Sequence, residues 1–203
     1  YGLKLDKSVD ELNNPTQIEA DGENLYFLDY SLDKTTKQYQ QTIKMYNKGY
    51  VYDITGWLPS EFRKDYQIKY FKVLSPSQLI ILTQTYPPRD WWKDQDNLPV
   101  IEHAVYLLDL SKKNMQKIYT KELVYSDTIN SIDVDTDGSF YLTFEKQVLK
   151  VAPDGQETEI IGLNDLAPEL QQQEARFYGI LKGKFDHIFV GLVQKMPTDI
   201  PST

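Results

Sequence analysis

Three aspartates near the middle of the chain have the spacing of a calcium-binding loop. Asp133, Asp135 and Asp137 occupy alternate positions, and Gly138 follows them. Carboxylates at alternate positions around a glycine turn can supply the hard oxygen ligands that Ca²⁺ prefers. An EF-hand places Glu at the twelfth position of its loop, and that position is Phe144 here. The sequence therefore favours outward-facing aspartates on a strand–turn–strand unit, with a calcium site as the alternative interpretation.

A long polar and aromatic stretch, residues 86–99, has residue types that suit recognition rather than catalysis. It reads YPPRDWWKDQDNLP and lies between two predicted strands, where a hairpin needs only roughly two to five residues. Adjacent tryptophans can stack on sugar rings or grip a proline-rich or aromatic peptide. We therefore predict a partner-binding site formed by Tyr86, Arg89, Asp90, Trp91 and Trp92. The alternative is that the tryptophans fold back over their own sheet or contact a partner domain.

The residue types of common catalytic centres are sparse in this chain. Its two histidines, His103 and His187, each fall in a predicted strand without a second histidine or a carboxylate pair at ligand spacing. The sequence also lacks the nucleophile elbow of hydrolases and the glycine-rich loops that cradle phosphates. There is no cysteine, which excludes thiolate chemistry, disulfides and zinc-ribbon or iron–sulfur sites. These residues favour a non-enzymatic protein without a cofactor, with calcium as the alternative.

Composition and charge exclude two classes of partner. The 203 residues carry a formal charge of −8, and no basic stripe is present to offset phosphate charge, which argues against nucleic acid or an anionic membrane surface. No apolar run approaches ~18 residues, so we expect no membrane span. The chain opens at Tyr1 rather than Met, and we expect that an N-terminal segment has been removed. We expect an extracytoplasmic or cell-surface location, with the cytoplasm as the alternative.

The aspartates belong to a stretch that predicts a four-stranded antiparallel meander. Glycine turns at Asp137-Gly138 and Pro153-Asp154-Gly155 separate short runs rich in β-branched and aromatic residues. Meanders of this kind are the unit of a β-propeller blade. The predicted strands are Ser131–Val134, Phe140–Phe144, Gln147–Val151 and Glu157–Ile161.

The rest of the chain reads as looser copies of this unit. We predict an all-β protein, with β-propeller blades over residues 1–196 and a linker-like tail over 197–203. The repeats cover about 15–57, 68–123, 129–162 and 177–196, steps typical of propeller repeats with insertions. About three and a half blades are visible, because the last repeat contains only two predicted strands. The alternatives are a four-bladed ring and part of a larger propeller, which we favour.

Two of the repeats share a motif of a proline or apolar residue, Asp-Gly, an apolar–aromatic–apolar run and a later lysine. The first copy consists of Pro15, Ile18, Asp21-Gly22, Leu25-Tyr26-Phe27-Leu28, Asp29, Ile43-Lys44-Met45 and Gly49, and the second of Ile132, Asp137-Gly138, Phe140-Tyr141-Leu142, Val148-Leu149-Lys150 and Asp154-Gly155. This pattern resembles the NHL and SMP-30-like propeller repeats over about half of the chain. The resemblance implies a propeller fold, and its motif carries no catalytic residue.

Two functions from different classes remain open at this point. The first is a non-enzymatic scaffold or recognition domain of a larger protein, which binds a protein, peptide or carbohydrate. Further domains or chains could then complete the propeller. The alternative that the resemblance implies is a calcium-dependent SMP-30-like lactonase or related hydrolase. Such a site needs acidic and amide side chains at the ring centre, for which Glu19, Asn130 and Asp133 are the candidates.

Overall fold

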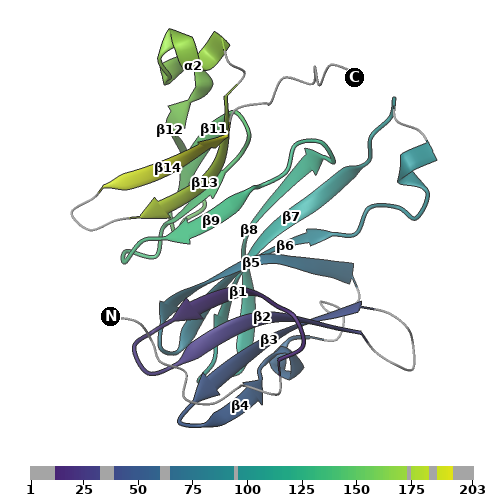
Figure 1. Cartoon of the computed structure of the whole chain (residues 1–203), viewed down its shortest axis with the longest axis vertical. Coiled ribbons are helices and arrows are strands. Elements are labelled where there is room, and N and C mark those ends of the chain that lie inside the picture. Colours follow the sequence, from purple (N-terminus) through teal and green to yellow (C-terminus); the bar gives the residue numbers. More distant parts are fainter. Residues whose placement is uncertain are drawn as a thin grey trace, which may run out of the picture. The chain divides into compact units, whose positions relative to one another are not determined.

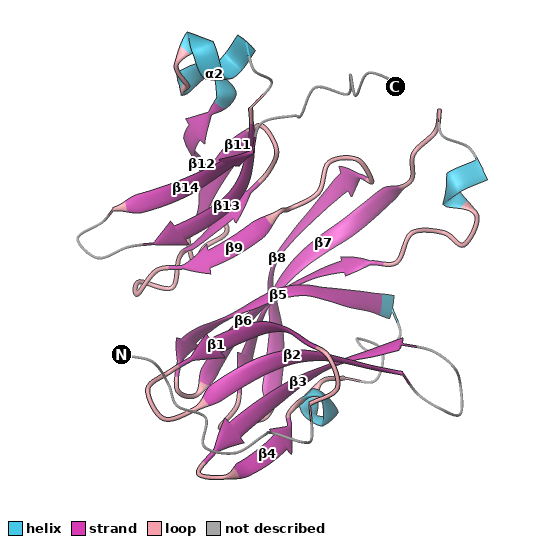
Figure 2. Ribbon diagram, in the orientation of Figure 1, coloured by secondary structure: helices cyan, strands magenta, loops and turns pink. Residues whose placement is uncertain are grey.

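The computed structural model describes residues 12–32, 39–59, 65–93, 96–172, 175–182 and 187–193. These residues form an all-β fold of four antiparallel sheets, each built from consecutive strands of one continuous segment (Figure 1, Figure 2). Three of the sheets have four strands and the last has two. The chain divides into two compact units, residues 1–83 with 106–116 and residues 84–105 with 117–203.

The first sheet contains β1 (Pro15–Ala20), β2 (Leu25–Leu32), β3 (Tyr39–Asn47) and β4 (Tyr50–Asp53) in this order. Two of its connections, β1–β2 and β3–β4, turn at a glycine with positive φ, Gly22 and Gly49. Gly49 has a φ of 91° and follows Lys48 at 47°, so both central residues of the β3–β4 turn are left-handed. Turns of this hand match the twist of antiparallel strands, which explains why this hairpin is so short.

The second sheet contains β5 (Tyr66–Ser75), β6 (Gln78–Thr85), β7 (Val100–Asp109) and β8 (Asn114–Val124). The long stretch between β6 and β7 contains the η2 turn (Trp91–Lys93). Another 3-10 turn, η1 (Thr55–Trp57), follows the first sheet. Residues 60–64, which follow shortly after this turn, lie outside the described part of the chain.

The third sheet contains β9 (Ser131–Val134), β10 (Phe140–Thr143), β11 (Gln147–Val151) and β12 (Glu157–Gly162), and the fourth contains β13 (Arg176–Lys182) and β14 (Ile188–Val193). All the strands predicted here are present, two of them with unchanged bounds. After β12 the chain forms two short helical pieces, η3 (Leu163–Asp165) and α2 (Pro168–Gln172), rather than one continuous helix. The reason is Pro168, because a proline biases the preceding residue away from the α conformation.

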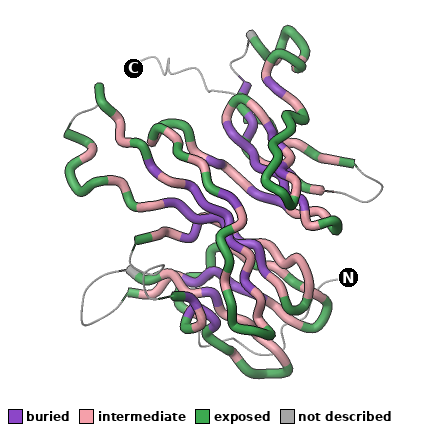
Figure 3. The backbone as a smooth tube through the Cα atoms, turned by 180° about the vertical axis from the view of Figure 1, so that it is seen from behind, coloured by how far each residue is buried: buried purple, intermediate pink, exposed green. Residues whose placement is uncertain are grey.

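The core is organised by the second strand of each four-stranded sheet. Residues 26–29 in β2, 79–84 in β6 and 140–143 in β10 are all buried (Figure 3). Successive residues of a strand point to opposite faces, so a run of consecutive buried residues means that both faces are covered. Among the described residues, no helix is both long and apolar enough to cross a membrane.

In each unit, the first strand of one sheet contacts the first strand of the next. The side-chain amide of Gln17 in β1 pairs with the backbone of Phe71 in β5, where its Oε1 accepts from the Phe71 N–H at 3.1 Å and its Nε2 donates to the Phe71 carbonyl. In the other unit, the Ser131 Oγ of β9 accepts from the Ile180 N–H of β13 at 3.1 Å. Polar side chains of the first strands thus join neighbouring sheets.

Candidate functional site

Among its described residues, the predicted recognition loop contains one 3-10 turn. The Trp91 N–H donates to the Pro88 carbonyl at 3.1 Å, and the Lys93 N–H donates to the Asp90 carbonyl at 3.0 Å. Pro87 and Pro88 restrict the backbone before this turn, which lowers the entropy of ordering it. The turn therefore gives the two tryptophans defined and different directions.

Trp91 is the anchor of this loop. Its ring centroid lies 4.2 Å from that of Tyr125, at an interplanar angle of 43°. The Tyr125 N–H in turn donates to the Pro99 carbonyl at 2.9 Å. The backbone N–H groups of both Trp91 and Tyr125 are therefore hydrogen-bonded. Tilted aromatic pairs at this separation stabilise beyond the area that they bury. For Trp91 the structure thus shows the local packing that we had weighed as the alternative to partner binding.

Trp92 and its neighbours instead face solvent. Trp92 and Tyr86 are each 53% exposed, and Arg89 and Asp90 are exposed as well. Asp90 forms an ion pair with Lys93 across the turn, with Oδ1 and Nζ 3.2 Å apart. The predicted site therefore consists of an anchor and an exposed surface, which we call the recognition surface: Tyr86, Arg89, Asp90 and Trp92.

The three spaced aspartates do not converge on one point. Asp133 is buried, so the expectation of outward-facing aspartates is wrong for this residue. Its Oδ1 accepts from the Val134 N–H at 2.9 Å, and its Oδ2 accepts from the Lys182 N–H of β13. This carboxylate joins two sheets. Asp135 and Asp137 lie on the turn that follows β9, and they do not accept the bond from the Lys182 N–H. Within the described ranges, no group of three histidine, cysteine, aspartate or glutamate side chains is placed to hold a metal ion.

Two lysines occupy the place beside the turn where a cation would bind. The Lys150 Nζ lies 3.4 Å from the Asp137 Oδ2 and 3.8 Å from the Asp135 Oδ2. The Lys182 Nζ lies 3.5 Å from the same Asp135 oxygen. The Tyr141 hydroxyl also donates to Asp135, at 3.0 Å. The two lysine ammonium groups of the chain thus supply positive charge beside these carboxylates, and the Tyr141 hydroxyl adds a neutral hydrogen-bond donor.

The protonation states of this cluster agree with internal pairing. Burial by itself would raise the pKa of Asp135, but the Thr136 N–H, the Tyr141 hydroxyl and Lys182 outweigh it and hold the pKa below its usual value. Burial, together with the bond to Asp135, raises the pKa of the Tyr141 hydroxyl, which stays a donor. The first sheet repeats this bond, because the Tyr26 hydroxyl donates to Asp21 at 2.9 Å. A tyrosine–aspartate bond therefore recurs in the first and third sheets, where it makes structural contacts within one sheet.

We expect millimolar calcium to leave the melting temperature of the protein nearly unchanged, because the ion would have to displace both lysine ammonium groups from Asp135 and Asp137. Thermal unfolding with calcium and with a chelator measures the effect. An ion at about one hundred times its Kd would stabilise the native state by about 2.7 kcal/mol. A rise of several degrees that disappears in Asp135→Ala would contradict this expectation, and a lactone assay in the same buffers tests the alternative hydrolase.

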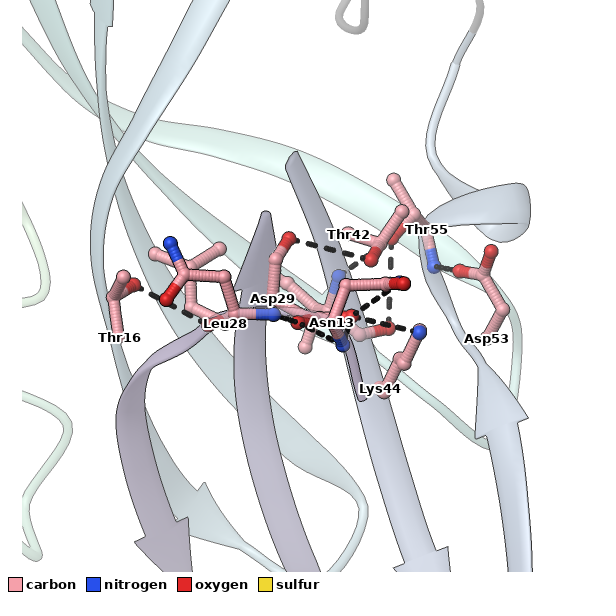
Figure 4. Close-up of polar contacts among 10 residues, drawn as sticks. Asn13, Thr16, Leu28, Asp29, Thr42, Lys44, Asp53 and Thr55 are labelled. Atoms are coloured by element: carbon pink, nitrogen blue, oxygen red, sulfur yellow. Dashed lines mark hydrogen bonds and ion pairs between the residues drawn. The ribbon is translucent and has the colours of Figure 1, made fainter. Parts of the chain in front are cut away.

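A buried carboxylate that the sequence did not single out as a site residue lies in the first sheet. Asp29 of β2 is fully buried, and its Oδ2 accepts from the Lys44 Nζ at 2.7 Å (Figure 4). Its Oδ1 accepts from the N–H groups of Asn14 at 2.7 Å and Asn13 at 3.0 Å. Burial would raise the pKa of Asp29, but these bonds hold it below its usual value. The group is thus an ionised tether for the segment before β1.

The remaining candidates are the two histidines and the polar residues considered for a hydrolase. His103 is fully buried and His187 is exposed. Among the residues considered for a hydrolase, Glu19 forms an ion pair with Lys72, with Oε1 and Nζ 2.9 Å apart. The Asn130 Nδ2 donates to the Phe177 carbonyl at 2.9 Å. Each of these two polar side chains therefore contacts a strand of the neighbouring sheet.

The fold defines an all-β protein of repeated antiparallel sheets. No protein-family model matches the chain, and no curated protein matches it. Two solved structures are similar to it: the apo form of the AtxE2 isopeptidase, at 12% identity and a TM-score of 0.45, and a variant of that isopeptidase with Astexin3-dC4 bound, at 11% and 0.46. The similarity covers 89% of this chain and 25% of each of those chains, so this chain spans about a quarter of their length.

Proposed function

We propose that this chain is a non-enzymatic recognition domain and that its recognition surface binds a protein, peptide or carbohydrate partner. One observation carries the proposal: adjacent tryptophans in one turn have opposite environments. Trp91 packs on Tyr125, whereas Trp92 is 53% exposed. The anchored ring fixes the turn, and the exposed ring is available to a partner.

The physical argument concerns preorganisation. A partner that binds a mobile loop loses affinity, because the loop must be ordered in the complex. Here the 3-10 turn and the Trp91–Tyr125 contact order the backbone beforehand. Tryptophan and tyrosine contribute large contact areas with few rotatable bonds, while Arg89 and Asp90 offer hydrogen-bonding groups beside them. Long insertions on rigid β scaffolds are frequent positions for binding residues.

The same proposal includes a β-propeller arrangement of the sheets within a larger protein. Three features support it: consecutive four-stranded meanders, second strands that are covered on both faces, and contacts between the first strands of neighbouring sheets. In a propeller, the blades pack face to face around a central axis, which produces this burial pattern. Further domains or chains would complete the ring, and we place the protein outside the cytoplasm or at the cell surface.

We expect Trp92→Ala to weaken partner binding by about 2 kcal/mol, or roughly thirtyfold in Kd, because truncating a central interface tryptophan costs this much or more. Binding is measured on arrays of glycans and of proline-rich and aromatic peptides, and then by titration calorimetry with the best binder. The urea unfolding midpoint should stay unchanged, because Trp92 already faces solvent.

Trp91→Ala is the matched variant for this experiment. It removes the contact with Tyr125, so we expect it to weaken binding and also to increase amide exchange across η2. If Trp92→Ala unfolds the protein, or if it binds as well as the parent does, Trp92 is not a recognition residue and the proposal is wrong. If no array member binds the parent protein, the proposed partner classes are also wrong.

A further inference from the structure

The last strand of the described chain, β14, lacks the features that protect sheet edges. Exposed edge strands normally carry charges or prolines that discourage pairing with other chains. Ile188–Val193 reads IFVGLV and contains neither. Every other edge strand in the described sheets carries at least one charge: Glu19 in β1, Asp53 in β4, Lys69 and Lys72 in β5, Lys117, Lys121 and Glu122 in β8, Asp133 in β9, Glu157 and Glu159 in β12, and Arg176 and Lys182 in β13.

The outward face of the fourth sheet is mostly apolar, with Arg176 beside Val193 as its charged residue. Leu181 of β13 and Phe189 of β14 pair directly across the two strands, and they are 57% and 61% exposed. Tyr178 and Val193 are exposed as well. The inward side differs, because Phe177 and other apolar residues of the sheet pack into a buried cluster with Tyr141 and Val148. The exposed pair therefore belongs to a well-packed sheet and does not result from a loose strand.

The other sheets of this protein indicate what covers such a strand. β14 is the second strand of its sheet, as β2, β6 and β10 are of theirs. Each of those three is hydrogen-bonded to a third strand and is buried at consecutive positions. β14 has the apolar composition of these interior strands, but none of its residues is buried. Residues 188–191 alternate between half-buried and exposed, and residues 192–193 are exposed. Its sequence fits an interior position.

We propose that the edge of β14 that no strand of the described residues covers binds an extended segment of a partner polypeptide as a third, antiparallel strand. The partner's side chains that face Leu181 and Phe189 must be uncharged, because β14 offers no charge to pair with them and a desolvated, unpaired charge is costly. The partner strand satisfies the backbone N–H and C=O groups along the edge, as in β-augmentation. A second copy of this chain fits less well, because each copy carries a formal charge of −8.

The test uses a fluorescent peptide with the sequence of residues 145–153, which contains β11, the shortest third strand of this protein. Binding to the full chain is followed by anisotropy and by hydrogen exchange. At about ten times the peptide's Kd, we expect exchange of the residue 188–193 amides to slow about tenfold. Phe189→Lys should abolish both effects without lowering the unfolding midpoint, because Phe189 faces outward. The matched control is Tyr50→Lys on edge strand β4, which should bind normally.

Three results would overturn the proposal. The first is unchanged exchange at β14 when the peptide is present at saturating concentration. The second is equal peptide binding by the parent and Phe189→Lys. The third is a dimer in light scattering that Phe189→Lys dissociates, which would identify a second copy as the occupant. Trp92→Ala should bind the peptide normally, so failure at this edge is distinguishable from failure of the recognition surface.

Discussion

Replacing Asp29 with alanine is expected to lower the free energy of unfolding by about 3 to 5 kcal/mol. The variant removes one partner of a buried ion pair and leaves the Lys44 ammonium without its carboxylate. It also leaves the N–H groups of Asn13 and Asn14 without their acceptor. Urea unfolding followed by tryptophan fluorescence measures the change. Asp154→Ala, at an exposed turn aspartate, is the matched control and should cost less than about 1 kcal/mol.

The same carboxylate makes stability depend on pH in a defined direction. The pKa of Asp29 is lowered in the folded protein, so the unfolded chain binds its proton more readily. Its contribution is therefore fully present above the unfolded pKa of about 3.9 and is lost as the pH falls through the folded pKa. We expect the unfolding midpoints of the parent and Asp29→Asn to differ at pH 7 and to converge below about pH 4. A difference that does not change with pH would contradict this role of Asp29.

Replacing Phe140 with alanine is the second change with a large expected effect, about 3 to 5 kcal/mol of unfolding free energy. Phe140 begins β10, is almost completely buried, and packs edge-to-face on Tyr119, with ring centroids 5.7 Å apart. Removing the ring loses its transfer free energy and leaves a cavity in a core that can only partly collapse. The measurement is again the urea midpoint.

Tyr50→Ala provides the control for this core substitution. Tyr50 is an aromatic residue of similar size in a strand, but it is 68% exposed, so the expected loss is within about 0.5 kcal/mol. Phe140→Leu should fall between the two, because it retains part of the buried volume. A loss below about 1 kcal/mol for Phe140→Ala would show that β10 does not belong to the core.

The strands were predictable because their signals are local. Ser131–Val134 and Gln147–Val151 were predicted with the bounds that the structure shows. Glycine positions contributed most, since Gly22, Gly138 and Gly155 adopt positive φ at the turns between strands. The helix after β12 was less predictable, because good helix-forming residues surround Pro168 and the sequence pattern alone does not show that the helix is split there.

The recognition loop was predictable as a segment, but the roles of its residues were not. Length and composition singled out residues 86–99. Trp91 and Trp92 are adjacent and chemically identical, so no local signal separates an anchor from an exposed ring. The difference between the two tryptophans depends on Tyr125. This residue follows β8, and it contacts the loop before β7 because β7 and β8 are neighbouring strands. The aspartates show the same limit. Their spacing suggested a calcium site, but the sequence does not show that Lys150 and Lys182, from distant strands, lie beside Asp135.

By itself, the sequence determined that this protein is all-β, where its strands and glycine turns lie, and which segment is unusually rich in aromatic residues. Alternating side chains and turn geometry act over a few residues, and the sequence records them directly. Only the tertiary structure decided that Asp29 is an ionised tether, that Asp135 is neutralised by lysines, and that Trp92 rather than Trp91 faces solvent. These properties depend on charges and rings from distant strands, whose positions are set by packing.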